Sequence, residues 1–179
     1  MNTLEAIKNR YSYRGSYKNT PIPREDLKKI LEAGLAAPSG CNKQTTSLIA
    51  LDNPELVNNI IDLVRKNGFR GTGGNPPAGI CVLTQHIPAY ADAYFYIQDY
   101  SAAIENILLA ITSLGYVSCW IEGQVKANAE TQEQIAKILN IPKDYSIVGF
   151  LPVGIPEEDG IRPEYKTFEE RAWFNKFGG

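Results

Sequence analysis

The chain has 179 residues, which fits one domain and is too short for two independent cores. Hydrophobic residues make up 44% of the sequence and charged residues 21%, a balance that excludes a disordered chain. The formal net charge of -2 indicates no basic surface for nucleic acid or anionic lipid, and the longest apolar run, near 107–111, is too short to span a membrane. The first residues enter an amphipathic pattern directly, without the apolar core of a signal peptide.

Hydrophobic periodicity and the positions of Gly and Pro predict helices and strands in alternation. In chain order we expect a helix over 3–10, an extended stretch over 11–20, a helix from Pro23 to Pro38, a strand over 46–51, a helix begun by Asn53 and Pro54, a glycine-rich loop over 68–79, a strand over 79–85, a helix over 94–114, a strand over 117–121, a helix over 128–139 and a strand over 145–153. Strands separated by helices imply α/β or α+β layering. The polar tail from residue 155 carries Phe168, Trp173, Phe174 and Phe177, so we expect it to dock on its own core or on a partner chain.

Several common kinds of site are disfavoured by the residues present. Cys41, Cys81 and Cys119 are widely spaced without a C-x-x-C pair, which favours buried structural thiols in a reducing cytoplasm over a metal site. His86 is the only histidine, which also disfavours metal binding and a nucleophile–histidine triad. The glycine-rich loop lacks the lysine of a Walker loop and the third glycine of a Rossmann fingerprint, so we interpret it as a flexible loop or lid.

The N-terminal extended stretch alternates Arg10, Ser12 and Arg14, and a period of two places the three side chains on one side of the chain. Two guanidinium groups with a hydroxyl between them suit a phosphate, because arginine offers a planar fork of donors. A solvated basic turn is the alternative. Arg162 and Lys166 in the tail add positive charge to such an anion site, or are plain surface charges.

Two further segments carry groups that suit a ligand. Asn42 and Gln44, within 37–44, offer both donors and acceptors at a period of two, which suits the edge of a heterocycle; a helix-terminating loop is the alternative. Glu122 and Gly123 close a predicted strand, where backbone N–H groups either face a ligand or form an ordinary turn.

The order of these motifs resembles the FMN-dependent nitroreductase family over nearly the whole chain. The matching segments are Arg10-Tyr-Ser-Tyr-Arg14 for the R-x-S-x-R/K motif, 31–44 with its A-P-S-x-x-N-x-Q core, 99–109 with Leu114-Gly115 for the central helix, Ile121-Glu-Gly123 for the flavin-facing turn, Ile141-Pro142 with 148–154 for the last strand, and 162–170 for the closing basic segment. The resemblance is specific for the family and uninformative about the substrate.

The resemblance implies an α+β, nitroreductase-like fold: a small mixed sheet flanked by helices, in an intertwined homodimer. Residues 1–179 would form a single FMN-binding domain, with 155–179 as a C-terminal arm exchanged between subunits. Two FMN molecules would lie in the dimer interface. The resemblance implies that Arg10, Ser12 and Arg14 would contact the phosphate and the ribityl side, and that Lys166, with Arg162 as a second candidate, would complete the phosphate site. Asn42 and Gln44 would contact the isoalloxazine ring, and the backbone of Glu122 and Gly123 would face N5. Pro38, Ser39 and Gly40 would contact the flavin from the other subunit.

The family implies a ping-pong reaction in which NADH or NADPH reduces the flavin and a flat, electron-poor small molecule, such as a nitroaromatic or a quinone, reoxidises it. No catalytic side chain and no metal are required. A reductive dehalogenase, a flavin-degrading enzyme and a non-catalytic flavin-binding or sensory module are the alternatives. The sequence departs from the family in three places. Thr45 and Thr46 replace a common Pro-Trp, and Arg70 and Asn75 are the candidates for the usual polar or basic contact before the second strand. The insertion between 85 and 98 that would cover the substrate is also reduced.

Overall fold

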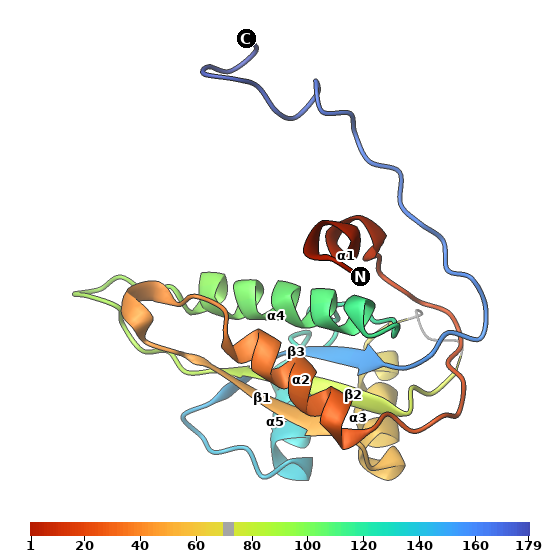
Figure 1. The fold of residues 1–179 in the computed structure, drawn as a ribbon. Coiled ribbons are helices and arrows are strands. Elements are labelled where there is room, and N and C mark those ends of the chain that lie inside the picture. Colours follow the sequence, from red (N-terminus) through yellow and green to blue (C-terminus); the bar gives the residue numbers. More distant parts are fainter. Residues whose placement is uncertain (70–73) are drawn as a thin grey trace.

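The computed structural model describes residues 1–69 and 74–179 and has a three-stranded antiparallel sheet at its centre (Figure 1). The strands are β1 (Thr46–Leu51), β2 (Ala78–Thr84) and β3 (Ser146–Val153), in the order β1-β2-β3. Every residue of the central strand β2 is buried, because β2 is paired on both sides and covered on both faces.

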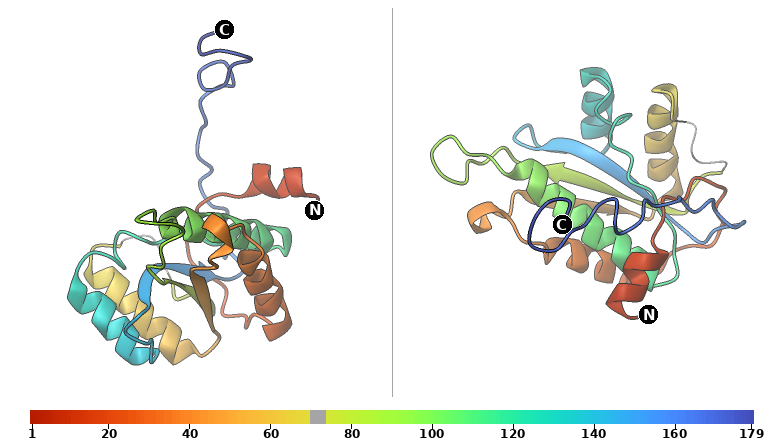
Figure 2. Two further views of the ribbon diagram at one scale, coloured as in Figure 1. Left: turned by 90° about the vertical axis from the view of Figure 1, so that its left-hand side faces the viewer. Right: turned by 90° about the horizontal axis from the view of Figure 1, so that it is seen from above.

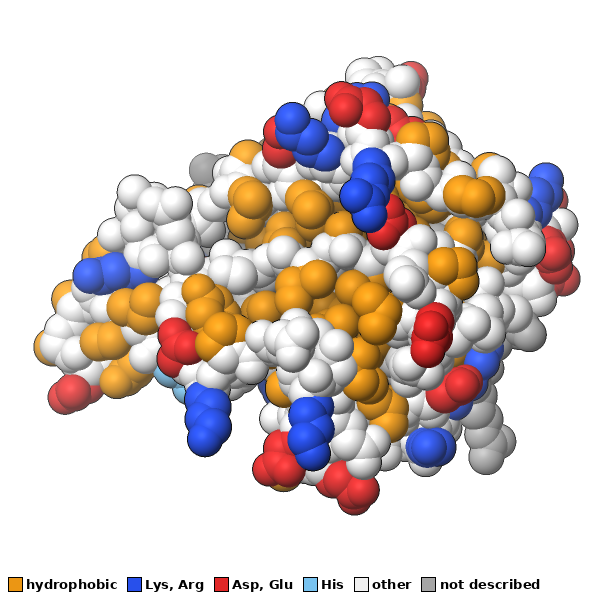
Figure 3. Space-filling model, turned by 90° about the horizontal axis from the view of Figure 1, so that it is seen from below, with side chains coloured by type: hydrophobic (Ala, Val, Ile, Leu, Met, Phe, Trp, Pro, Cys, Tyr) orange, Lys and Arg blue, Asp and Glu red, His pale blue; other side chains and the backbone are white. Residues whose placement is uncertain are grey.

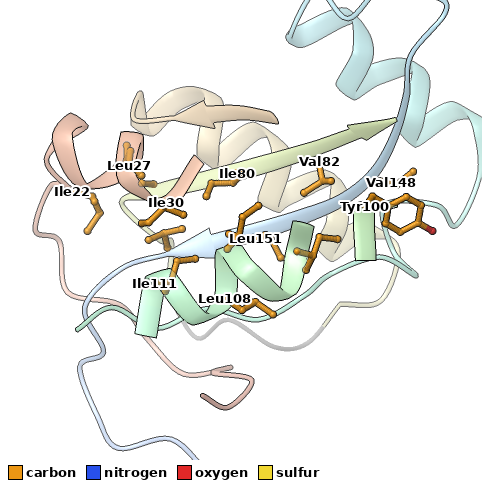
Figure 4. Close-up of a cluster of buried hydrophobic side chains, with 14 residues drawn as sticks. Ile22, Leu27, Ile30, Ile80, Val82, Tyr100, Leu108, Ile111, Val148 and Leu151 are labelled. Carbon is orange, nitrogen blue, oxygen red and sulfur yellow. The ribbon is translucent and has the colours of Figure 1, made fainter. Parts of the chain in front are cut away.

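Helices cover both faces of the sheet. α2 (Arg24–Leu35) and α4 (Tyr96–Ser113) pack on one face, and α3 (Pro54–Lys66) and α5 (Ala129–Ile138) on the other (Figures 1 and 2). Successive side chains of a strand point to opposite faces, so Ile80 and Val82 enter the cluster under α2 and α4 (Figure 4), whereas Cys81 enters the other. The expected α+β architecture of a small sheet flanked by helices is confirmed.

Local sequence explains where the helices begin and how closely they pack. Asn2, Asn53 and Asn128 cap α1 (Thr3–Asn9), α3 and α5 by accepting hydrogen bonds from backbone N–H groups of the first turn. Gly34 allows α2 to approach α4, since a Cβ at this position would lie 2.6 Å from Cγ1 of Ile107. The close approach at Gly34 packs α4 against α2, and α4 also contacts the sheet and α1.

The strand expected over 117–121 forms only isolated bridges, from Val117 to Gly154 and from Ile121 to Phe150. The register between these bridges places Cys119 opposite Pro152, which has no backbone N–H and interrupts the ladder. The three named strands run antiparallel, and parallel pairing among the described residues is limited to the bridge between Ser12 and Ser118.

The C-terminal tail leaves the body of the molecule after a bridge between Tyr17 and Pro156, and it extends past α1 (Figures 1 and 2). Ile161 is 93% exposed and Phe177 is 87% exposed, so the tail does not dock on its own core. Its aromatic rings contact one another, as Trp173 and Phe177 do at 4.2 Å between centroids. Within the described ranges, no helix has the length and apolar character needed to cross a membrane.

Candidate functional site

Arg10, Ser12 and Arg14 line one cavity of about 750 Å³, as their alternation predicts. The segment is held by Tyr13, whose backbone N–H donates to the carbonyl of Ser118 at 2.8 Å and whose side chain is fully buried. Because neighbouring side chains alternate, burying Tyr13 directs Ser12 and Arg14 to the cavity. The remaining lining residues of this arginine cavity are Gly15, Glu158, Asp159, Gly160, Ile161, Pro163 and Tyr165.

The two arginines of the cavity have different partners. Nε of Arg10 lies 3.2 Å from a carboxylate oxygen of Glu105 on α4. This contact is an ion pair without the geometry of a hydrogen bond, and the buried nitrogen makes no hydrogen bond in the described part of the chain. Arg14 donates from Nη1 to the carbonyl of Ser12 at 3.4 Å. This one long bond leaves most of the donors of Arg14 available. The positive charge of Arg14 also acts to lower the pKa of the Cys119 thiol, which burial raises to about 12.

The segment after α2, which we call the Ser39 loop (residues 36–45), has a strained backbone. Cys41, Asn42 and Gln44 have φ angles of 49°, 52° and 49°, in the left-handed region that non-glycine residues rarely adopt. The expected period of two for Asn42 and Gln44 is wrong, because a short 3-10 helix over Gly40–Asn42 curls the chain there. Strained residues of this kind cluster at ligand sites.

Hydrogen bonds hold the Ser39 loop in this conformation. The N–H of Gly40 and the hydroxyl of Thr45 donate to the two carboxylate oxygens of Asp99, each at 2.8 Å. The N–H of Gln44 donates to Oγ of Ser39 at 2.9 Å. Pro38, Ser39 and Gln44 line a smaller cavity of about 180 Å³ with Asp99, whereas Gly40 and Asn42 do not. Within one chain, the loop and the arginine cavity are thus separate surfaces.

Glu122 and Gly123 belong to a turn over 122–126 that is closed by the bond from the N–H of Lys126 to the carbonyl of Glu122 at 2.9 Å. The Glu122 carboxylate accepts hydrogen bonds from Tyr100 and Lys126. No atom lies within 4 Å of a Cβ built on Gly123, so the outer side of this Glu122 turn is open to a ligand.

The tail cations do not join the arginine cavity of their own chain. Arg162 donates to the carbonyl of Asn9 at 3.0 Å and lies over the ring of Tyr11, with Cζ 4.7 Å from the centroid. Lys166 is exposed and lines none of the cavity wall. Glu158 and Asp159 do line it, and sequence reasoning missed them because no motif marks them. Of the two candidates for the contact before β2, Arg70 lies outside the described residues, and Asn75 accepts a hydrogen bond from Arg65 at 2.8 Å.

Comparison with known proteins assigns the chain to a family. The family model described as the nitroreductase family matches residues 7–76 and 65–155. The chain belongs to the nitroreductase family. The chain is 31% identical over 163 residues to a Methanothermobacter thermautotrophicus protein, named as a candidate NADH dehydrogenase/NAD(P)H nitroreductase, and the match covers 89% of this chain and 80% of the relative.

Solved structures agree with this assignment. The chain is similar to a Bacteroides fragilis nitroreductase with bound FMN, at 27% identity and a TM-score of 0.75, over 98% of this chain and all of the other. It is also similar to a BluB-like flavoprotein from Clostridium difficile, at 25% identity and a TM-score of 0.82, with 98% of this chain and 100% of that one covered.

Proposed function

We propose that this protein is an FMN-dependent enzyme that oxidises NADH or NADPH and reduces flat, electron-poor acceptors such as nitroaromatics and quinones. The arginine cavity carries the proposal, because Arg10, Ser12 and Arg14 meet there on one wall. The FMN bound to the Bacteroides fragilis nitroreductase and the name of the Methanothermobacter relative support it. We further propose that 1–179 is one FMN-binding domain with 155–179 as an arm.

The residues of the cavity fit FMN. A phosphate needs several N–H and O–H donors, which the two guanidinium groups and the Ser12 hydroxyl supply. Arg14 uses one donor in a long bond of 3.4 Å to the carbonyl of Ser12, which leaves its guanidinium group suited to a bound anion. The open side of Gly123 leaves room for a flat ring beside the backbone. Both features favour a bound flavin over an ordinary basic turn.

The protein contributes binding and orientation in this scheme. When bound, FMN would supply the redox chemistry, which is hydride transfer between the nicotinamide and the acceptor. Arg10, Ser12 and Arg14 would together hold the phosphate and the ribityl side. The backbone of Glu122 and Gly123 would contact the flavin near N5, and Asn42 and Gln44 would contact the isoalloxazine ring. No side chain serves as nucleophile or general base.

We propose a homodimer in which each site uses both chains. Pro38, Ser39 and Gly40 would approach the flavin of the partner subunit, since none of the three lines the arginine cavity of its own chain. Lys166, with Arg162 as a second candidate, would complete the phosphate site. The exposed aromatic tail supports arm exchange, because an exposed apolar segment of this kind gains by docking on a partner.

The sheet offers a place for such an arm. β1 is an edge strand whose first five residues are only half-buried, and an unpaired edge favours pairing with another chain. Figure 3 views the molecule from the side away from α1 and shows apolar side chains gathered across the middle of this face. Both observations support a surface that is covered in the dimer.

The decisive experiment is anaerobic reduction of the purified protein by NADH or NADPH. We expect a yellow protein whose flavin absorbance bleaches on addition of the nicotinamide and returns when a quinone or air is admitted. Free FMN at the same concentration, with the same nicotinamide, is the control. Stable yellow colour would favour a binding module, and absorbance that never returns would favour a flavin-degrading enzyme.

A further inference from the structure

The Glu122 carboxylate is held from two directions by the same oxygen atom. The hydroxyl of Tyr100, on α4, donates to Oε1 at 3.1 Å. The ammonium group of Lys126 donates to Oε1 at 2.9 Å. The first contact crosses from a helix to the turn and the second lies within the turn, so together they connect the backbone of Glu122 to α4.

Tyr100 is rigidly placed for this contact. It is 2% exposed and belongs to the hydrophobic cluster between α4 and the sheet. Figure 4 shows Tyr100 at one end of that cluster, with its hydroxyl oxygen pointing away from the apolar side chains. Burial, followed by the charge of Glu122, raises the pKa of Tyr100, and the hydrogen bond to Glu122 raises the pKa of Lys126. Both groups therefore stay protonated donors at neutral pH.

The other side of the turn is held by Asn67, the C-terminal cap of α3. Nδ2 of Asn67 donates to the carbonyl of Gln124 at 2.9 Å and to Oγ1 of Thr131 at 2.7 Å. Its Oδ1 accepts a hydrogen bond from Asn128 at 3.2 Å. The Glu122 turn is thus held at 122 from α4 and at 124 from α3, while Gly123 between them remains open.

We propose that Tyr100 is a positioning residue of the flavin site, acting through Glu122 to hold the backbone N–H groups of Glu122 and Gly123 in place. The proposal rests on the proposed function, since it requires that this turn face the flavin. Tyr100 does not touch the ligand in this scheme. Its hydroxyl, on the rigid helix α4, holds the Glu122 side chain and thereby the backbone N–H groups of the Glu122 turn. A backbone N–H held beside N5 donates to the lone pair of the oxidised ring, whereas N5 carries a hydrogen in the reduced ring, so a donor fixed there favours oxidised FMN.

The test compares Tyr100→Phe with Tyr116→Phe. Each variant loses one hydroxyl that donates to a carboxylate, since Tyr116 donates to Asp26 at 2.8 Å beyond the opposite end of α4. Amide hydrogen exchange is measured first, without flavin. We expect exchange over 121–126 to be about tenfold faster in Tyr100→Phe and unchanged in Tyr116→Phe. Unchanged exchange in the turn of Tyr100→Phe would overturn the proposal whatever the flavin does.

The second measurement is the reduction potential of bound FMN. We expect Tyr100→Phe to shift the preference about tenfold toward reduced over oxidised FMN, which is about 30 mV for a two-electron couple. Tyr116→Phe should match the wild type. Faster exchange with an unchanged potential would overturn the positioning role while leaving the proposed function intact. Wild-type protein that binds no FMN would overturn both, so the two failures are distinguished.

Discussion

Asp99 and Gly40 are 59 positions apart in the chain, and the carboxylate of Asp99 accepts a hydrogen bond from the N–H of Gly40 at 2.8 Å. Asp99 lies in the first turn of α4 and is 5% exposed, so the bond is shielded from water. The second carboxylate oxygen accepts from Thr45, the last residue of the Ser39 loop. One side chain therefore holds the loop on both sides of its left-handed residues Cys41, Asn42 and Gln44.

Asp99→Ala removes both acceptors and should destabilise the protein. A buried donor left without a partner costs about 1–3 kcal/mol, so the free energy of unfolding in urea should fall by at least that amount. Asp144→Ala is the control, because Asp144 accepts from Gln85 at an exposed site and its loss should cost less than about 0.5 kcal/mol. Equal losses in the two variants would contradict the role given to Asp99.

Arg14→Ala should weaken FMN binding by about tenfold to a hundredfold, because a hydrogen bond to a charged group contributes about 1.5–3 kcal/mol. Riboflavin lacks the phosphate, so its binding should change much less. Arg14→Lys should fall between, since lysine keeps the charge and loses the planar fork. Fluorescence titration of the apoprotein with both flavins measures these effects.

The control for this titration is Arg24→Ala, since Arg24 pairs with Asp52 on the surface, away from the cavity. Arg10→Ala should resemble Arg14→Ala, but it also leaves Glu105 without its ion pair. The double variant Arg10→Ala, Glu105→Ala separates the two effects. Unchanged FMN affinity in Arg14→Ala and in this double variant, or an equal loss for riboflavin, would show that the arginines do not bind the phosphate.

The protein should be a homodimer in solution. Light scattering after gel filtration should give about twice the chain mass of 19.8 kDa. Removing 168–179, which deletes Phe168, Trp173, Phe174 and Phe177 but leaves the lining of the arginine cavity intact, should weaken both the dimer and FMN binding. A monomer of either length that retains FMN would contradict a site built from two chains.

Turnover should be ping-pong, because the nicotinamide and the acceptor use the same open face in succession. Initial rates at several fixed acceptor concentrations should give parallel lines in a double-reciprocal plot. Intersecting lines, together with evidence for a ternary complex, would argue against a shared face.

Cys81 and Cys119 should resist thiol reagents in the folded protein, because burial raises the pKa of each thiol to about 12 and keeps it protonated. Cys41 is exposed and should react. A colorimetric thiol assay should therefore count one fast thiol per chain in buffer and three in denaturant, a number that the sequence fixes. Fast labelling of Cys81 in the native protein would contradict its placement in the core.

Features that depend on neighbouring residues could be predicted from the sequence alone. The helix caps at Asn53 and Asn128 lie where the polar residues precede an apolar pattern. The shared side of Arg10, Ser12 and Arg14 follows from the geometry of an extended chain, in which every second side chain points the same way. Such local rules hold whatever the rest of the fold does.

Only the tertiary structure decided the features that join distant segments. The curl at Asn42 and Gln44 is held by Asp99, and the break in the expected strand at Cys119 comes from Pro152 across the sheet. Arg162 lies on Tyr11 instead of entering the arginine cavity. Neither hydrophobic periodicity nor motif spacing encodes these contacts, because each depends on which elements pack together and in what register. The sequence therefore determined the elements and the shared side of the N-terminal motif, while packing decided which groups meet at the site.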